Sequence, residues 1–401
     1  MTGGDRCQVA IVGAGPVGTV MATLLAQAGV DVIVLESGHD CAQDLRASTF
    51  HPSTLEMLDQ IGITSMLLAK GLKAPVYHWR DRQSGDVIDF DLGEISDVTR
   101  YPFRIQCEQY HLSRALAEGL DGLPSADMRF GHRLLNFQQD DSGVDLFVET
   151  MTDVRRIRAD YLIGADGANS IVRKWLGIEF DGFTYPERFL CLSTKVELAD
   201  HLPNLAAVNY VSDPQEWLVL LRVPALWRVL VPTNSEMSDD ELRSDAMKNA
   251  IFDRLIGDGA LVETKHRTLY RVHQRVAQSF REGRVMLVGD AAHLNNPLGG
   301  FGMNSGVHDA FNLFEKLQPI LKGKKDDAGL ALYDRQRREV THSFTQTQTK
   351  ENMAFIKGGQ DNAHEMRRQA MLAIKQDDSR RRAYMLRQAM FESLSQAAAI
   401  Q

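Results

Sequence analysis

Glycine residues stand beside single carboxylates at three places in this chain, and the first of these places is the most regular. Gly13, Gly15 and Gly18 follow in G-x-G-x-x-G spacing, and Glu36 comes 18 residues after the last glycine. In this spacing the first glycine permits a tight turn, the second lets the backbone approach a pyrophosphate, and the third lets a helix pack on a strand. A carboxylate about 20 residues further on can bind a ribose. The stretch predicts a site for an ADP-containing dinucleotide, with a plain glycine-rich turn as the alternative.

The residues around this motif predict the elements that would hold it. Val9–Val12 form a short apolar strand, Thr19–Ala28 have the apolar spacing of a helix that ends at Gly29, and Val30–Leu35 form a second strand. The N-terminus of that helix would present free N–H groups to an anion. Strand, turn, helix, strand and acid together are far more specific than the glycines alone.

A second glycine-flanked carboxylate lies in Tyr161–Gly177, YLIGADGANSIVRKWLG. An apolar strand leads directly to Asp166, and a helix that carries Ser170 and Arg173 follows. A carboxylate at the carboxyl end of a strand is well placed to contact a ligand. Because Asp and Ser also cap helix N-termini routinely, helix capping is the alternative interpretation.

The third stretch, Gly283–Asn312, again brings a strand to an acid and a glycine loop. The strand RVMLVGD delivers Asp290 at its carboxyl end, and a loop with Gly299 and Gly300 precedes a helix from about Gly302. Such a loop lets the backbone approach a flat ligand, and the N-terminus of the helix favours negative charge.

Composition excludes several classes of function. The chain has 401 residues and a net charge of −8, which gives no reason to expect nucleic-acid binding. Its four cysteines are far apart and form no C-x-x-C pair, so they indicate reduced thiols, neither a disulfide framework nor a metal site. The first strand begins within ten residues of Met1, and no apolar run reaches the roughly 18 residues of a membrane span. We expect a soluble, cytoplasmic protein.

Between and after these motifs, the pattern changes from alternating strands and helices to strands alone. A hairpin is expected over 76–90, a meander over 128–137, 144–150 and 156–163, and a β-rich middle region over 187–196, 206–211, 217–223 and 227–231. A helical stretch over 238–257 and a strand over 264–274 follow. From Gln318 onward the chain is predicted to be helical with charged faces. The middle region is a candidate second domain.

The three motifs in this order resemble one family, the single-component (class A) FAD-dependent aromatic hydroxylases typified by p-hydroxybenzoate hydroxylase. The resemblance covers roughly residues 8–350, and the following tail is similar to phenol and phenylpropionate hydroxylases. It implies an α/β fold: a Rossmann-like FAD-binding domain of the glutathione-reductase type, an inserted, mainly antiparallel β-sheet substrate domain, and C-terminal helices. The expected boundaries are 1–75, 100–178 and 277–345 for the first, 76–99 and 179–276 for the second, and 346–401 for the helices.

The resemblance also assigns cofactor contacts to residues of this sequence. Glu36 would hold the adenosine ribose, Arg46 the flavin or its phosphates, and Gln106 would lie near the ribityl chain. Asp166 belongs to a motif that the family uses for both FAD and NADPH, and Asp290 would bond the ribityl or pyrophosphate group. The glycines of the first motif would hold the pyrophosphate, and the residues expected around the isoalloxazine ring are Gly299, Gly300, Gly302 and Asn304.

The reaction implied by the resemblance is hydroxylation of a small phenolic or N-heteroaromatic ring. NADPH or NADH would reduce FAD, and the reduced flavin would bind O2 as a C4a-hydroperoxide that transfers one oxygen atom to the substrate. An FAD oxidoreductase or epoxidase acting on a quinone or polyketide is the alternative within the fold. A non-catalytic, protein-binding member is a third possibility, and a homodimer is compatible with all three.

A phenol reacts more readily as its phenolate, so a base or hydrogen-bond donor near the substrate is expected. Candidate catalytic residues are His78 on the hairpin, Tyr210 and Arg222 on the middle strands, and Pro297 in the glycine loop, where the family often has two prolines and this chain has Asn296-Pro297. Tyr77 on the hairpin and His293 after the third motif are further candidates, and a structural role is the favoured interpretation for His293. For each side chain, packing or a structural hydrogen bond is the alternative, and Arg222 could either pair with a substrate carboxylate or lie on the exposed face of its sheet.

Overall fold

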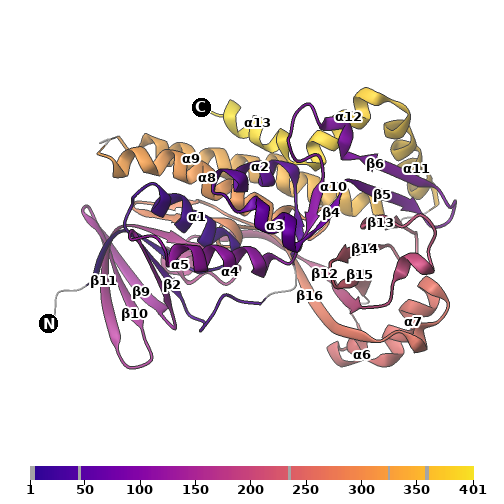
Figure 1. The fold of residues 1–401 in the computed structure, drawn as a ribbon, viewed down its shortest axis with the longest axis horizontal. Helices are drawn as coiled ribbons and strands as arrows, with labels where there is room; N and C mark the ends of the chain where they lie inside the picture. Colours follow the sequence, from indigo (N-terminus) through magenta and orange to yellow (C-terminus); the bar gives the residue numbers. More distant parts are fainter. Residues whose placement is uncertain (1–4, 44–46, 234–235, 324–325, 357–360) are drawn as a thin grey trace.

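The structure is a computed structural model that describes residues 5–43, 47–233, 236–323, 326–356 and 361–401. Two large sheets lie at opposite ends of the long axis, and helices α8 and α9 run along one side of the first (Figure 1). Helices α11 and α12 lie over the second sheet, near the hairpin β5–β6 (Figure 1). The fold is a mixed α/β architecture with a helical C-terminal segment.

The first sheet is built around parallel strands in the order β18-β11-β1-β2-β8. Its central strand β1 pairs Val9 with Val32 of β2 on one side and with Tyr161 of β11 on the other. Antiparallel strands β17, β10 and β9 extend the sheet beyond β18 and β11. Its strands are β1 Asp5–Val12, β2 Val32–Glu36, β8 Ala126–Phe130, β9 Arg133–Asp140, β10 Gly143–Glu149, β11 Val154–Gly164, β17 Arg281–Glu282 and β18 Val285–Leu287.

Helices pack on this sheet because its parallel strands are apolar on both faces. Val9, Ala10 and Ile11 are fully buried in β1. The helices of this part are α1 Pro16–Gln27, α4 Gln109–Leu120, α5 Ile171–Trp175, α8 Phe301–Leu321 and α9 Ala328–Val340. Helices α1 and α8 contact so closely that a Cβ atom added at Gly306 would lie 2.5 Å from Val17.

The second sheet has the strand order β19-β16-β12-β15-β14-β13-β5-β6 and is antiparallel except where β13 runs parallel to β5. Its strands are β5 Val76–Asp81, β6 Val87–Asp91, β12 Phe180–Thr194, β13 Val208–Ser212, β14 Leu218–Val223, β15 Leu226–Thr233, β16 Thr264–Ala277 and β19 His293–Leu294. Residues on alternate positions point to opposite faces. Leu190 and Leu192 pack with Phe252 of α7 on one face, whereas Phe189 and Cys191 pack with the C-terminal helices on the other.

Smaller elements complete the fold. A three-stranded sheet, β3-β7-β4, lies beside helices α2 and α3. The remaining elements are β3 Thr49–Phe50, α2 Pro52–Gln60, α3 Thr64–Lys70, β4 Leu72–Ala74, β7 Arg104–Gln106, α6 Asp239–Arg243, α7 Asp245–Ile256, the π-helix Thr341–Gln346, α10 Thr347–Ile356, α11 Asp361–Gln376, α12 Asp378–Gln388 and α13 Phe391–Ala399.

The predicted α/β fold class, the hairpin, the strands of the middle region and the helical C-terminal segment are confirmed. The strand expected over 128–137 is wrong as a single element, because Gly131 has a φ of +66° and ends the ladder there. Its first half is β8, which pairs with β2, and its second half is β9, which pairs with β10. Among the described residues, no helix is long and apolar enough to cross a membrane.

Candidate active site

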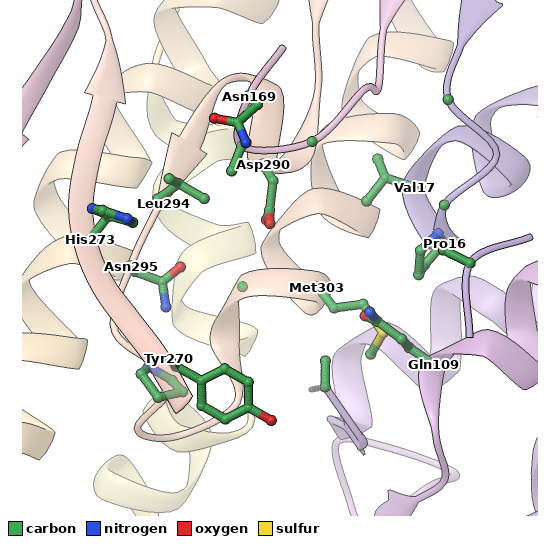
Figure 2. A pocket seen from close by; sticks show the side chains of 18 of the residues that line it. Pro16, Val17, Gln109, Asn169, Tyr270, His273, Asp290, Leu294, Asn295 and Met303 are labelled. Carbon is green, nitrogen blue, oxygen red and sulfur yellow. The ribbon is translucent and has the colours of Figure 1, made fainter. Parts of the chain in front are cut away.

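A cavity of about 910 Å³ joins the carboxyl ends of the parallel strands to one face of the antiparallel sheet. Figure 2 shows Tyr270 and His273 of β16 opposite Pro16 and Val17 of α1, with the Asp290 carboxylate pointing into the space between them. Each of the three glycine–acid motifs contributes to the lining. The motif residues that line it are Gly13, Gly15, Glu36, Asp166, Asp290, Gly299, Gly300 and Gly302.

The three glycines of the first motif are required for three different reasons. Gly13 has a φ of +105°, and a Cβ atom there would lie 2.4 Å from the carbonyl oxygen of Ala165. A Cβ at Gly18 would lie 2.0 Å from the carbonyl oxygen of Gly13, so this residue lets α1 pack against the turn. A Cβ at Gly15 would meet nothing within 4 Å, and Gly15 borders the cavity. Open space remains above the backbone at Gly15, where the helix N-terminus would meet a pyrophosphate.

Glu36 ends β2 at the same edge of the sheet. Its Oε2 accepts a hydrogen bond from the backbone N–H of Ala14 at 2.9 Å, and its Oε1 accepts one from Gly38 at 2.8 Å. The carboxylate is therefore held against the glycine turn by two backbone donors. Since it also lines the cavity, it is positioned for the hydroxyl groups of a ribose.

Asp166 caps a helix and also borders the cavity. Its Oδ2 accepts hydrogen bonds from the backbone N–H groups of Ile171 at 2.7 Å and Val172 at 3.1 Å, at the start of α5. Its Oδ1 is buried and has no protein partner, although the residue lines the cavity. Burial raises the pKa of Asp166, and the hydrogen bonds from Ser170 and the backbone offset part of that rise. Arg173 ties this loop to the third motif, because it donates to the carbonyl oxygens of Ala168 and Ala291.

A buried ion network supports the loop that carries Asp290. The backbone N–H of Gly289 donates to Oδ2 of Asp309 at 3.0 Å, and Nε2 of His293 lies 2.8 Å from the same oxygen. Arg337 donates to Oδ1 of Asp309 at 2.6 Å. Burial raises the pKa of Asp309, but His293 and Arg337 outweigh it and hold that pKa at about 2. His293 therefore lies in this network behind the cavity wall.

The glycine loop at the start of α8 has a backbone that only glycine adopts easily. Gly299 and Gly300 have φ values of +100° and +73°. A Cβ at Gly299 would lie 2.4 Å from the ring of Phe301. Asn304 holds the loop from behind, because its Nδ2 donates to the carbonyl oxygens of Gly300 at 2.6 Å and Thr49 at 2.8 Å.

Three of the predicted cofactor residues lie behind the cavity lining, and one cannot be placed. Gly18 and Asn304 support the two glycine turns from behind. Gln106, fully buried in β7, accepts a hydrogen bond from Thr49 at 3.0 Å. Arg46 lies outside the described residues.

The substrate candidates separate into two groups. Tyr210 and Pro297 line the cavity. His78 and Arg222 do not, because Nε2 of His78 lies 3.1 Å from Asp89 and Nη2 of Arg222 lies 3.0 Å from Glu197 on the side of the sheet away from the cavity lining. The structure therefore brings two of the four candidate catalytic residues to the cavity.

Sequence reasoning missed two buried arginines at the substrate end of the cavity. Arg228 of β15 lines the cavity and lies 3.4 Å from Oε1 of Glu108, and both side chains are buried. Arg104 of β7 is fully buried and reaches the hydroxyl of Tyr210. The detectable pattern was a single charge inside an apolar strand, as in Leu226–Thr233, LWRVLVPT. The rest of the wall here is mostly apolar, and includes Cys191, Val219, Leu221, Leu230, Val272 and Leu298.

The residues of this cavity fit FAD. The open space above Gly15 and the buried, unpartnered oxygen of Asp166 are the features that a bound dinucleotide would use. The cavity continues past the α8 loop into a mostly apolar chamber, where a flat ring and a small substrate can lie together. One cavity thus connects a dinucleotide site to a chamber of suitable character for an aromatic compound.

Comparison with known proteins identifies the family to which this chain belongs. The model of the FAD binding domain family matches residues 6–348. Para-nitrophenol 4-monooxygenase of Pseudomonas sp. (strain WBC-3) is 33% identical over 368 residues, covering 90% of each chain. The 6-hydroxy-3-succinoylpyridine 3-monooxygenase of Pseudomonas putida (strain DSM 28022 / S16) is 31% identical over 351 residues, covering 86% of this chain and 88% of the relative.

The solved structures agree with the sequences. The crystal structure of p-nitrophenol 4-monooxygenase from Pseudomonas putida DLL-E4 matches with a TM-score of 0.91 at 31% identity, and the match covers 97% of this chain and 98% of that one. Both large sheets and the C-terminal helices therefore have counterparts in an aromatic monooxygenase. The chain belongs to the FAD-binding aromatic hydroxylases and is an FAD-dependent aromatic-ring monooxygenase that uses NAD(P)H.

Proposed function

We propose that this enzyme hydroxylates a small, single-ring phenol or hydroxypyridine, with electrons from NADPH or NADH and one oxygen atom from O2. The observation that carries this proposal is the chamber at the substrate end. Its wall is mostly apolar, and its polar groups include the hydroxyl of Tyr210 and the buried guanidinium of Arg228. The relatives named for nitrophenol and hydroxypyridine oxidation support the same class of ring.

The bound FAD supplies the electron transfer and oxygen activation, and the protein supplies binding, orientation and exclusion of water. In our proposal the turn at Gly13 and Gly15 and the N-terminus of α1 bind the pyrophosphate, and Glu36 binds the adenosine ribose. Asp166 and Asp290 bind the middle of the cofactor, from two loops that Arg173 joins.

The α8 loop would face the flavin ring. Because Phe301 starts α8 directly after Gly300, the free N–H groups of the first helical turn favour negative charge beside the loop. Such a helix end would stabilise negative charge on the reduced ring system. Pro297 and Leu298 continue the loop into the chamber and would keep water from the reacting atoms.

The substrate would lie with its oxygen toward Tyr210 and its ring among the apolar side chains of β14, β15 and β16. Arg228 pairs with Glu108 at 3.4 Å. It can therefore donate a further hydrogen bond to an acceptor group of the substrate while it keeps this partner in the protein. A ring substituent that accepts hydrogen bonds, such as a nitro or carbonyl group, suits this position.

The remaining features of the proposal follow from the sheets and the thiols. We propose that the two sheets correspond to an FAD-binding domain (1–75, 100–178 and 277–345) and a substrate domain (76–99 and 179–276), followed by helices over 346–401. All four cysteines are free and buried, which suits the reducing cytoplasm. A homodimer stays a prediction that light scattering can check.

The test is a panel of phenols and hydroxypyridines with and without nitro or carboxylate groups, mixed with the purified holoenzyme. NADPH and NADH oxidation, O2 consumption and product mass are measured together. We expect at least one single-ring phenol to stimulate NAD(P)H oxidation and to gain one oxygen atom that derives from labelled O2. If only quinones or multi-ring compounds are oxidised, or if oxygen is consumed without insertion, the proposal is wrong.

A further inference from the structure

Arg104 of β7 is a fully buried cation at the edge of the substrate chamber. Its Nη1 donates a hydrogen bond to the hydroxyl of Tyr210 at 3.4 Å, and its guanidinium carbon lies 4.1 Å from the centre of the Tyr77 ring. Its Nε and Nη2 are buried and have no hydrogen-bond partner among the described residues. The guanidinium therefore uses only part of its donor capacity.

Two other buried arginines, Arg228 and Arg337, each face a carboxylate. Arg228 lies 3.4 Å from Glu108, and Arg337 lies 2.6 Å from Asp309. For Arg104, no carboxylate of the described residues lies within 4.0 Å. A buried charge without a counter-charge is costly, because burial removes it from water and no neighbour offsets that loss. Such a cation has free capacity for an anion that is not part of the protein.

Among the described residues, the titratable groups packed around Arg104 come from four other segments, and none is a carboxylate. Tyr77 of β5 is buried and Tyr384 of α12 is partly buried, and burial raises the pKa of each hydroxyl, so both stay neutral. Burial also lowers the pKa of His51, with Arg104 contributing, so that imidazole stays uncharged. Tyr210 of β13 is the fourth neighbour and lines the cavity. Of these four described neighbours, Tyr210 is the one that links the cation to the chamber.

Tyr210 connects Arg104 to that chamber. Its ring packs edge-on against Tyr77, with 6.3 Å between ring centres, which fixes where the hydroxyl lies. Because this oxygen accepts an N–H of Arg104, its own proton can be donated to a ligand in the chamber. A hydroxyl that accepts from a cation is polarised and becomes a stronger donor.

We propose that Arg104 is a positioning residue that acts through the hydroxyl of Tyr210 to hold the phenolic oxygen of the substrate in its ionised form. The inference rests on the proposed function only for the kind of ligand, a small phenol. Ionisation makes the ring a better nucleophile, so this pair would prepare the substrate before oxygen transfer. The proton released by the phenol goes to solvent or buffer, since neither Tyr210 nor Arg104 has to accept it.

The experiment is a pH titration of 4-nitrophenol bound to the holoenzyme in the absence of NAD(P)H. Difference absorbance distinguishes the ionised from the neutral probe and requires no turnover. We expect the bound probe to ionise at least about one pH unit below the free probe, which is the size of shift that a nearby cation causes. Arg104→Met and Tyr210→Phe should each reverse most of this shift, and Arg104→Lys should keep part of it.

Arg267→Met is the matched control. Arg267 lies on β16, in the same sheet as Tyr210, pairs with Asp245 and is not part of the cavity lining. Its loss should leave the ionisation of the bound probe unchanged. Flavin content and circular dichroism are recorded for every variant, so that loss of the fold is recognised separately.

The outcomes test the role of Arg104 and the proposed function separately. If the bound probe ionises at the same pH in wild type, Arg104→Met and Tyr210→Phe, or if 4-nitrophenol does not bind in its ionised form, the inference is wrong. Should Arg104→Met fail to fold, Tyr210→Phe decides alone, because it removes only one hydroxyl. If the probe binds ionised but no phenol or hydroxypyridine of the panel gains oxygen, the proposed function is wrong and this inference stands.

Discussion

The two ends of the cavity are built in different ways. At the dinucleotide end glycine backbone forms part of the lining, at the turn of Gly13 and Gly15 and at the loop of Gly299 and Gly300, beside carboxylates such as Asp290. At the substrate end the polar groups belong to side chains of the antiparallel sheet, such as Tyr210 and Arg228. Backbone binds the part of a ligand that every member of a cofactor class shares, whereas side chains can change without altering the fold.

The two ends of the cavity also differ in whether their buried charges are paired within the protein. Behind the dinucleotide end, Asp309 is matched by Arg337, His293 and a backbone N–H. At the substrate end, Arg104 has two donor atoms that no group in the described part of the chain accepts. The charges of the Asp309 network are matched within the protein, whereas the guanidinium of Arg104 is placed so that a ligand can complete its bonding. The predictions below test this contrast, beginning with the largest effect.

Replacing Asp309 with Asn should be the most damaging single change among them. It would leave Arg337 buried without a counter-charge, which costs about 3–5 kcal/mol of the free energy of unfolding. It would also release Gly289 and so lower FAD affinity. Urea unfolding and flavin titration measure both effects. Asp160→Asn is the control, because Asp160 pairs with Arg6 at the surface and should cost less than about 1 kcal/mol.

The same network predicts the response of the protein to acid. The pKa of Asp309 in the folded chain is about 2, below its ordinary value near 3.9 in an unfolded chain. Its stabilising contribution is therefore complete above about pH 4 and is lost as the pH falls toward 2. Asp309→Asn should show a flatter dependence of stability on pH between 4 and 2. A wild-type and a variant curve of the same slope would contradict the role of this carboxylate.

Alanine substitutions at two glycines of the first motif should affect stability and FAD binding separately. Gly18→Ala puts a Cβ 2.0 Å from a backbone oxygen, so we expect a loss of about 1–3 kcal/mol in the free energy of unfolding of the apoprotein. Gly15→Ala meets no protein atom within 4 Å, so apoprotein stability should hold while FAD affinity falls at least about tenfold. Gly119→Ala, in α4 with open space around it, is the control for both. Equal FAD affinity in Gly15→Ala and wild type would remove the pyrophosphate from this turn.

At the substrate end, Glu108→Gln should weaken the ion pair that holds Arg228 without changing the flavin content of the enzyme. The amide keeps an acceptor but loses the charge, and the bond is long at 3.4 Å, so we expect a loss of about 1 kcal/mol in stability. KM for the phenol should rise several-fold while flavin content stays at the wild-type level. A loss of flavin with unchanged KM would mean that Arg228 serves the dinucleotide end.

The difference between the ends also explains what the sequence could reveal. Gly13, Gly15 and Gly18 were detectable because glycines at this fixed spacing have few explanations other than a nucleotide-binding turn. Glu36 at the end of β2 and Asp290 after β18 were detectable because each is a single acid at the carboxyl end of an apolar strand. Arg104 and Arg228 were missed because they come from strands β7 and β15, more than 100 residues apart, and neither has a local pattern that names a partner. His78 and Arg222 were chosen for residue type, but which face of a strand meets the cavity is decided by the packing of both sheet faces.

The smallest predicted effect concerns the ion pairs that hold α11 and α12 to the segment around β6. Arg368 lies 2.6 Å from Asp86, Arg381 2.9 Å from Glu94, and Arg382 2.6 Å from Asp97. These pairs are partly exposed, so each should be worth less than about 1 kcal/mol and should weaken in salt. The acids all come from the hairpin side and the bases all come from the C-terminal helices.

This arrangement ties the pairs to the substrate end, because α12 also carries Tyr384, which packs on Phe90 at 4.8 Å between ring centres. Raising ionic strength should therefore increase KM for the phenol by about twofold and leave FAD affinity unchanged. Arg382→Glu should reproduce the rise in KM at low salt, and the double change with Asp97→Arg should reverse it. If salt or Arg382→Glu instead releases FAD, the two ends are coupled through the C-terminal helices and cannot be treated as independent.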